Sequence, residues 1–128
     1  MSESYRGVII EESLADKNIL KKIKIISTRV EKVIEKHKTP WLVQWTLHTV
    51  EVPAENSKLI AEEISKSLDN KHHNWYADYK TKDRHIIIFS NKIFEIDRKS
   101  KEQYDAAKNY GLSLGIPVYQ VNFFPEIK

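Results

Sequence analysis

The sequence contains no cysteine and only three glycines among its 128 residues. Without cysteine the protein forms neither a disulfide framework nor a thiolate site. The glycines Gly7, Gly111 and Gly115 are too few, and wrongly spaced, for the glycine-rich loops that hold nucleotide phosphates. Disulfide scaffolds, P-loops and dinucleotide-binding motifs are therefore excluded.

Long apolar runs are also missing. The first residues are polar, and the run Val8–Ile10 is too short for a signal segment. No stretch approaches the roughly 20 apolar residues that a membrane-spanning helix needs. The sequence has no Asn-x-Ser/Thr acceptor for glycosylation. We therefore expect a cytoplasmic protein.

Length and composition are those of an ordinary globular chain. Apolar residues make up 41% and charged residues 30% of the sequence. We interpret residues 1–128 as a single domain, in which residues 1–40 form an N-terminal extension packed on a sheet built by residues 41–128. The net charge of +3 lies in residues 1–40, which hold nine Lys or Arg against six Asp or Glu. This mild excess around Lys17–Lys38 leaves weak, non-specific nucleic-acid binding as an alternative function.

The stretch from Val43 to Asp97 organises the expected fold. Apolar and polar residues alternate from Trp41 to Val52, which indicates a long strand. Pro53 ends this strand and suits the first turn of a helix that reaches about Leu68. The apolar side chains of this helix recur at helical spacing. The other expected elements are a strand at 6–12, a brief helix from Ser13, strands at 75–80, 84–90 and 93–97, a helix at about 100–114 that opens with a Ser100–Gln103 capping box, and a strand at 118–124.

One segment, Ile23–Glu35, is ambiguous. Its apolar residues recur at alternating intervals of four and three, as on a helix. However, Ile23–Val30 is crowded with β-branched residues, which suit a strand. We favour the strand, because residues 35–40 then form a loop that completes a long hairpin with the Trp41 strand.

The order of elements from Val43 onward predicts an α+β fold. Strand, helix, strand, hairpin, helix and strand is the split βαβ order of ferredoxin-like domains. Right-handed crossovers would place both helices on one face of an antiparallel sheet, giving a two-layer sandwich with one open face. This architecture serves many unrelated functions, so it carries no chemistry by itself.

Two patterns could indicate a catalytic serine or a metal site, but their surroundings in the sequence do not fit either. Gly111–Gly115 matches G-x-S-x-G around Ser113, but it lies at the end of a helix and no histidine follows it. The five histidines show no H-x-H or H-x-x-x-H spacing, and there is no cysteine to complete a shell. We therefore expect no metal and no cofactor.

The strongest site hypothesis is the open sheet face. A histidine, a carboxylate, a phenol and three amides on one surface could bind a small polar ligand. His48 and Asp78 are the candidate catalytic residues, as base and orienting carboxylate. The residues expected to share this face and to bind the ligand are Gln44, His48, Tyr76, Asp78, Gln120 and Asn122, with Thr46 beside them.

Three functions follow from these patterns. The first is a small binding or interaction domain, homodimeric, that uses its open sheet face for a ligand or a partner. The second is a small cofactor-independent enzyme that uses His48 and Asp78. The third is the weak nucleic-acid binder described above.

Overall fold

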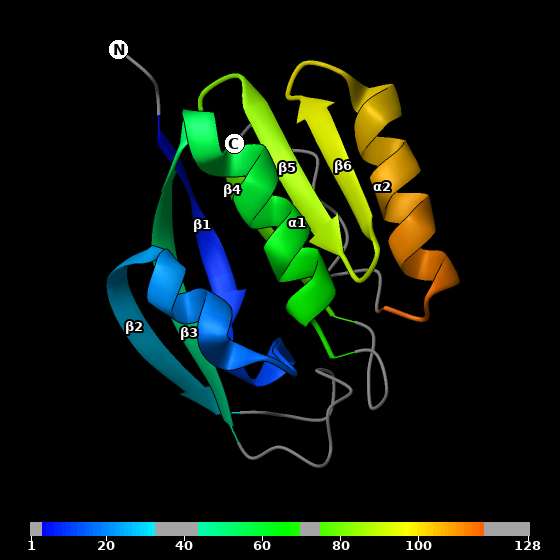
Figure 1. Ribbon diagram of the computed structural model, residues 1–128. Coiled ribbons are helices and arrows are strands. Elements are labelled where there is room, and N and C mark those ends of the chain that lie inside the picture. The colour runs from blue at the N-terminus through cyan, green and yellow to red at the C-terminus, as the bar shows by residue number, and fades with distance from the viewer. Residues whose placement is uncertain (1–3, 33–43, 70–74, 117–128) are drawn as a thin grey trace.

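The computed structural model describes residues 4–32, 44–69 and 75–116. Within these residues, six strands form one sheet in the order β2-β3-β1-β4-β5-β6, and every neighbouring pair is antiparallel (Figure 1). The strands are β1 Ser4–Ile10, β2 Lys24–Lys32, β3 Gln44–Pro53, β4 Tyr76–Lys80, β5 Arg84–Phe89 and β6 Lys92–Asp97. The helices are α1 Ser57–Ser67 and α2 Lys101–Ser113, with short 3₁₀ helices η1 Glu11–Ser13, η2 Lys17–Lys22 and η4 Ala54–Asn56. The predicted α+β class is confirmed.

The N-terminal strand β1 lies inside the sheet, between β3 and β4. Gly7 pairs with Val50 on one side and with Tyr79 on the other. A Cβ atom at Gly7 would lie 1.9 Å from the carbonyl oxygen of Asp78, so the close approach of β1 to β4 requires glycine here. Residues 1–40, expected as an extension packed on the sheet, thus contribute one of its central strands, β1, and its edge strand, β2.

The ferredoxin-like topology is not confirmed. Since β3 and β4 are each antiparallel to β1, they run parallel to one another, and α1 connects them as a split βαβ unit. In the expected topology the strand between them would be β5. That position is taken by β1, and β5 lies outside β4. The strand expected at 118–124 lies outside the described residues.

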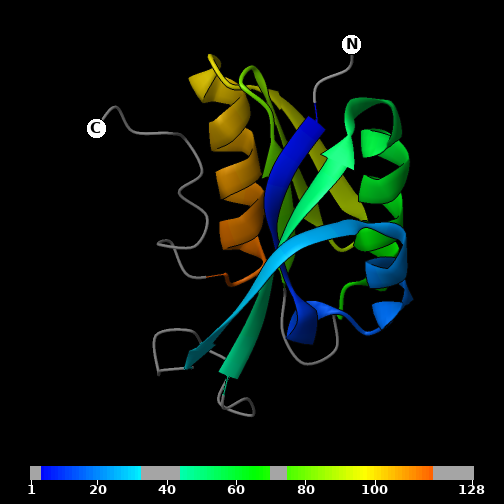
Figure 2. The ribbon, with the colours of Figure 1, turned by 90° about the vertical axis from the view of Figure 1, so that its left-hand side faces the viewer.

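Strand β5 is buried on both faces and receives one helix on each. Ile86 and Ile88 pack in the core that contains the inward residues of α1, whereas Ile87 and Phe89 pack with those of α2. Figure 2 shows the two helices on opposite sides of the sheet. We call these sides the α1 face and the α2 face. The expectation that both helices cover one face is therefore wrong, because the apolar run of β5 needs a cover on each side.

Several local predictions are confirmed. The inward stripe of α1, with Ile60, Ala61 and Ile64, is buried. At the start of α2, the Ser100 hydroxyl oxygen accepts a hydrogen bond from the Gln103 amide at 3.2 Å. The Gln103 side chain does not close the box; its Oε1 accepts from the Asp97 amide at 2.6 Å.

The ambiguous segment Ile23–Glu35 is a strand in its described part. β2 pairs antiparallel with β3 along nearly its whole length, so the strand interpretation is confirmed and the helical spacing was incidental. The brief helix expected from Ser13 is replaced by η1 and η2. Among residues 4–32, 44–69 and 75–116, no helix combines the length and apolarity needed to cross a membrane.

Burial of Tyr79 predicts a loss of stability at alkaline pH. Its ring is fully buried, its hydroxyl donates to the Ser57 carbonyl oxygen at 2.5 Å, and burial raises its pKa. Above about pH 10 the phenol of the unfolded chain ionises while the folded one stays protonated, so the free energy of unfolding falls as pH rises. Urea denaturation at a series of pH values above about 10 measures this effect. The free energy of unfolding should fall less steeply with pH for Tyr79→Phe than for the wild type. Curves of equal slope would contradict this assignment.

Candidate functional site

A buried histidine joins the sheet to α2. His85 lies on the α2 face, where its Nε2 lies 2.6 Å from Asp78 Oδ2 and its Nδ1 lies 3.0 Å from the Tyr104 hydroxyl. A carboxylate only accepts hydrogen bonds, so Nε2 donates to Asp78; in the tautomer with its proton on Nε2 alone, Nδ1 accepts from the phenol. Burial raises the pKa of Tyr104, and the nearby Arg98 opposes this shift. The phenol is therefore the donor at the end of this array.

Only the carboxylate end of this array reaches solvent. His85 and Tyr104 are buried, whereas 27% of the Asp78 side chain is exposed. A ligand could touch Asp78 but not the imidazole behind it. The array therefore ties β4, β5 and α2 together.

A second histidine joins β3 to β2 and to η1. His48 is buried in β3; its Nε2 donates to Glu11 Oε1 at 2.8 Å, and its Nδ1 accepts from the Thr28 hydroxyl at 2.8 Å. Beside it, the Glu12 carboxylate accepts from the Thr46 amide at 2.6 Å and from the Thr46 hydroxyl at 2.8 Å. These bonds fasten β2 and η1 to β3.

The two candidate catalytic residues lie on opposite faces of the sheet. His48 pairs with Ile9, which belongs to the core of the α1 face, whereas Asp78 pairs with Ile87 in the core of the α2 face. Directly paired residues of antiparallel strands point to the same side. The expected pairing of His48 with Asp78 is therefore wrong. The structure pairs each with a different partner, Glu11 and His85.

The other residues expected at the ligand site are dispersed. Tyr76 shares the α2 face with Asp78 and packs against Phe89. Gln44 is exposed at the start of β3, opposite Lys32. Gln120 and Asn122 lie outside the described residues.

Sequence reasoning missed Glu11, Thr28, His85 and Tyr104. The contact between Asp78 and His85 could have been found, since a hairpin turning at 81–83 places them diagonally on one face. The contact of His85 with Tyr104 depends on the side of the sheet that α2 covers; the apolar run of β5 indicates a cover on each face but does not specify which helix supplies it.

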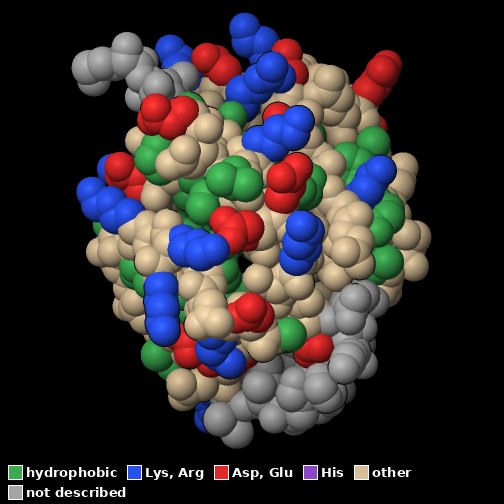
Figure 3. Space-filling model, in the orientation of Figure 1, with side chains coloured by type: hydrophobic (Ala, Val, Ile, Leu, Met, Phe, Trp, Pro, Cys, Tyr) green, Lys and Arg blue, Asp and Glu red, His purple; other side chains and the backbone are tan. Residues whose placement is uncertain are grey.

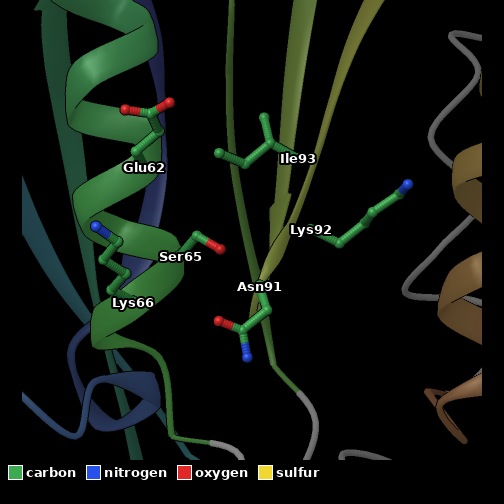
Figure 4. A pocket seen from close by; sticks show the side chains of 6 residues that line it. All are labelled: Glu62, Ser65, Lys66, Asn91, Lys92 and Ile93. Carbon is green, nitrogen blue, oxygen red and sulfur yellow. The ribbon is translucent and has the colours of Figure 1, made fainter.

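A shallow pocket of about 310 Å³ lies between α1 and the β5–β6 hairpin. Figure 4 shows Ser65 and Ile93 directed into this space and Lys92 directed away from α1. The Lys92 ammonium lies 5.4 Å from the centre of the Phe94 ring, and the Ser65 hydroxyl donates to the Phe89 carbonyl oxygen. The pocket is at the lower end of the size range of ligand sites and brings together no acid–base pair. Its lining residues are Glu62, Ser65, Lys66, Asn91, Lys92 and Ile93.

Charges are mixed on the α1 face. Lys and Arg side chains alternate with Asp and Glu over this surface, without a continuous basic patch (Figure 3). Lys22, in the basic N-terminal stretch, forms an ion pair with Glu63 of α1 at 2.6 Å. Within the described ranges no cluster of three or more His, Asp or Glu side chains could hold a metal ion.

The edge strand β2 carries the most unusual surface. Among the described strands it is the last of the sheet on one side, and of its nine residues only Glu31 is partly buried. Five large apolar side chains are exposed among the described residues, and three of them, Ile25, Ile26 and Val30, stand on this strand. We call this surface the β2 edge.

The hydroxyl of Tyr104 predicts a measurable contribution to stability. Tyr104→Phe removes the donor to a buried imidazole nitrogen and should destabilise the fold by about 1–3 kcal/mol. Tyr110→Phe is the matched control: its ring packs on Phe89 in the same core, and the described residues give its hydroxyl no hydrogen bond. That control should change stability by less than about 0.5 kcal/mol. Equal unfolding free energies for the two variants would contradict the role given to this array.

Comparison with protein-family models, with curated proteins and with solved structures finds no match for this chain.

Proposed function

We propose that this protein is a protein–protein interaction domain that associates through the β2 edge. The observation that carries the proposal is the concentration of exposed apolar side chains on one terminal strand of the sheet. A terminal strand presents a row of backbone N–H and C=O groups along its outer side, which another strand can extend. Burial of its apolar side chains adds to the free energy of that pairing, at about 25 cal/mol per Å².

The β2 edge also carries features that limit indiscriminate pairing. Lys24, Arg29 and Lys32 place cationic groups along the strand, and the register with β3 shifts between Ile25 and Ser27, which marks a bulge at Ile26. Charged residues and bulges are the usual protection of natural edges against aggregation. Together with the apolar side chains, they favour a partner that complements the charges and accommodates the bulge.

The opposite end of the sheet is a poorer candidate. In β6, Ile93 packs toward the α1 core, and Phe94 and Ile96 pack in the α2 core. Its apolar side chains are therefore already engaged within the protein. This contrast favours β2 over β6 as the interacting edge.

The alternatives have less support. An open sheet face was the expected surface for a ligand or a second copy, but α1 and α2 cover opposite faces of the sheet. The acid–base enzyme relied on His48 and Asp78 together, and these residues are separated. The shallow pocket beside α1 is lined mainly by polar side chains, but no hydrogen bond or ion pair among these described residues defines a chemistry for a ligand.

Substitution of Val30 tests the proposal. Val30 is 57% exposed on β2, and Val30→Lys should weaken association at least tenfold, because a further charge must be desolvated at the edge. Leu59→Lys is the matched control, since Leu59 is 61% exposed on α1, away from the edge. The measurement is the size of the tagged protein, by sedimentation for the pure protein and by gel filtration in an extract of its source cells.

The proposal expects a wild-type species larger than the 15.1 kDa chain in at least one of these settings. That species should be lost with Val30→Lys and retained with Leu59→Lys. A wild-type protein that is monomeric in both settings overturns the proposal, as does a larger species that only Leu59→Lys disrupts.

A further inference from the structure

We infer that the partner of the β2 edge is β2 of a second copy, and that the two strands pair antiparallel about Thr28. The inference rests on the proposed function and adds the identity and register of the partner. The supporting observation is the pattern of side chains along β2. When two copies of this strand are aligned antiparallel, one register places apolar residues opposite apolar residues and a cation opposite an anion.

The pairing of β2 with β3 defines which face each residue of β2 occupies. Lys24 pairs with Glu51 and Ile25 with Val50; after the bulge at Ile26, Ser27 pairs with Thr49 and Thr28 with His48. The two residues Ile25 and Ile26 therefore occupy one position of the strand. Because paired residues share a face, the α1 face carries Ile25, Thr28 and Val30, and the α2 face carries Lys24, Ser27, Arg29 and Glu31.

A symmetric pair of antiparallel edge strands has its two-fold axis perpendicular to the sheet. Each face of one copy then continues into the same face of the other, so only residues of the same face can stand opposite each other. With the axis at Thr28, the position shared by Ile25 and Ile26 stands opposite Val30 of the second copy. Lys24 stands opposite Glu31, and Ser27 opposite Arg29. All of these pairs lie on matching faces.

This register places two apolar pairs and two pairs of opposite charge across the axis. Cross-strand pairs of both kinds stabilise a sheet, by roughly 0.2–1 kcal/mol each. Of the cations along the edge, Lys24 is thereby matched by Glu31 of the second copy, which also pairs with Arg29 of its own strand at 3.4 Å. Val30 is also the most exposed apolar side chain of β2, and it becomes covered by the bulge of the second copy.

Neighbouring registers are unfavourable. Moving the axis to Ser27 places Lys24 opposite Arg29, and moving it to Arg29 places that cation opposite itself. Like charges directly opposite each other destabilise a strand pair. An axis that passes between two residues changes the register by one position. It would place side chains of opposite faces across from each other, which the symmetry forbids. Thr28 is the axis that avoids all three conflicts.

Disulfide trapping tests the register in a protein that has no cysteine of its own. Opposed Cα atoms in an antiparallel pair are about 4.5–5.5 Å apart, within the range of a disulfide. Thr28→Cys should therefore form a covalent dimer under mild oxidation. In Val30→Cys the cysteines of the two copies would lie four positions apart along the strands, roughly 13 Å, which is too far for a disulfide. This control should therefore stay monomeric on a non-reducing gel.

A charge exchange gives a second readout that leaves Thr28 in place. Lys24→Glu and Glu31→Lys should each weaken dimerisation of the pure protein about tenfold, which corresponds to the loss of both symmetric charge pairs. The double variant restores opposite charges and should recover most of the affinity. Sedimentation equilibrium measures all four proteins.

The outcomes separate this inference from the proposed function. The pure protein could stay monomeric while the extract contains a larger species that Val30→Lys disrupts. That result overturns the second copy as the partner and leaves the proposed function standing. A dimer that cross-links through Val30→Cys and not through Thr28→Cys overturns the register, as does a double charge variant that is as weak as the single ones. Cross-linking through Thr28→Cys together with charge rescue supports both.

Discussion

The burial of both faces of β5 is the constraint on which the fold depends. Its side chains alternate between two cores, with Ile86 and Ile88 in one and Ile87 and Phe89 in the other. One layer of helices cannot cover both sets. The chain places α1 on one side of β5 and α2 on the other. Three of the apolar side chains that stay exposed among the described residues, Ile25, Ile26 and Val30, lie on the edge strand β2.

The two histidine arrays connect the elements of this arrangement by hydrogen bonds. His85 connects α2 to β4 and β5, and His48 connects β2 and η1 to β3. Each ring has both nitrogens engaged, by a carboxylate on one side and a hydroxyl on the other, as a buried imidazole requires. The bond from Thr28 to His48 holds β2 against β3 at the centre of the β2 edge. A strand ordered in this way loses less entropy when a partner pairs with it.

Local sequence patterns predicted most elements and few of their long-range contacts. The alternation in β3, the stripe of α1 and the Ser100 cap depend on neighbours in sequence, and all three are present in the structure. The position of β1 depends on the close approach of Gly7 to Asp78, across 71 positions of the chain, which periodicity does not encode. The same dependence on long-range contacts explains why the partner of Asp78 was predicted wrongly. Asp78 was assigned to His48 because the face covered by α2 was unknown, whereas the structure supplies His85 from the adjacent strand.

Amide hydrogen exchange of β2 at several protein concentrations tests the central claim most directly. In a single copy, the amides of β2 that bond to β3 are protected and those that point outward exchange freely. The account predicts that the outward amides from Lys24 to Glu31 gain protection as concentration rises, while the inward ones do not change. Outward amides that exchange at the same fast rate at every concentration would contradict it.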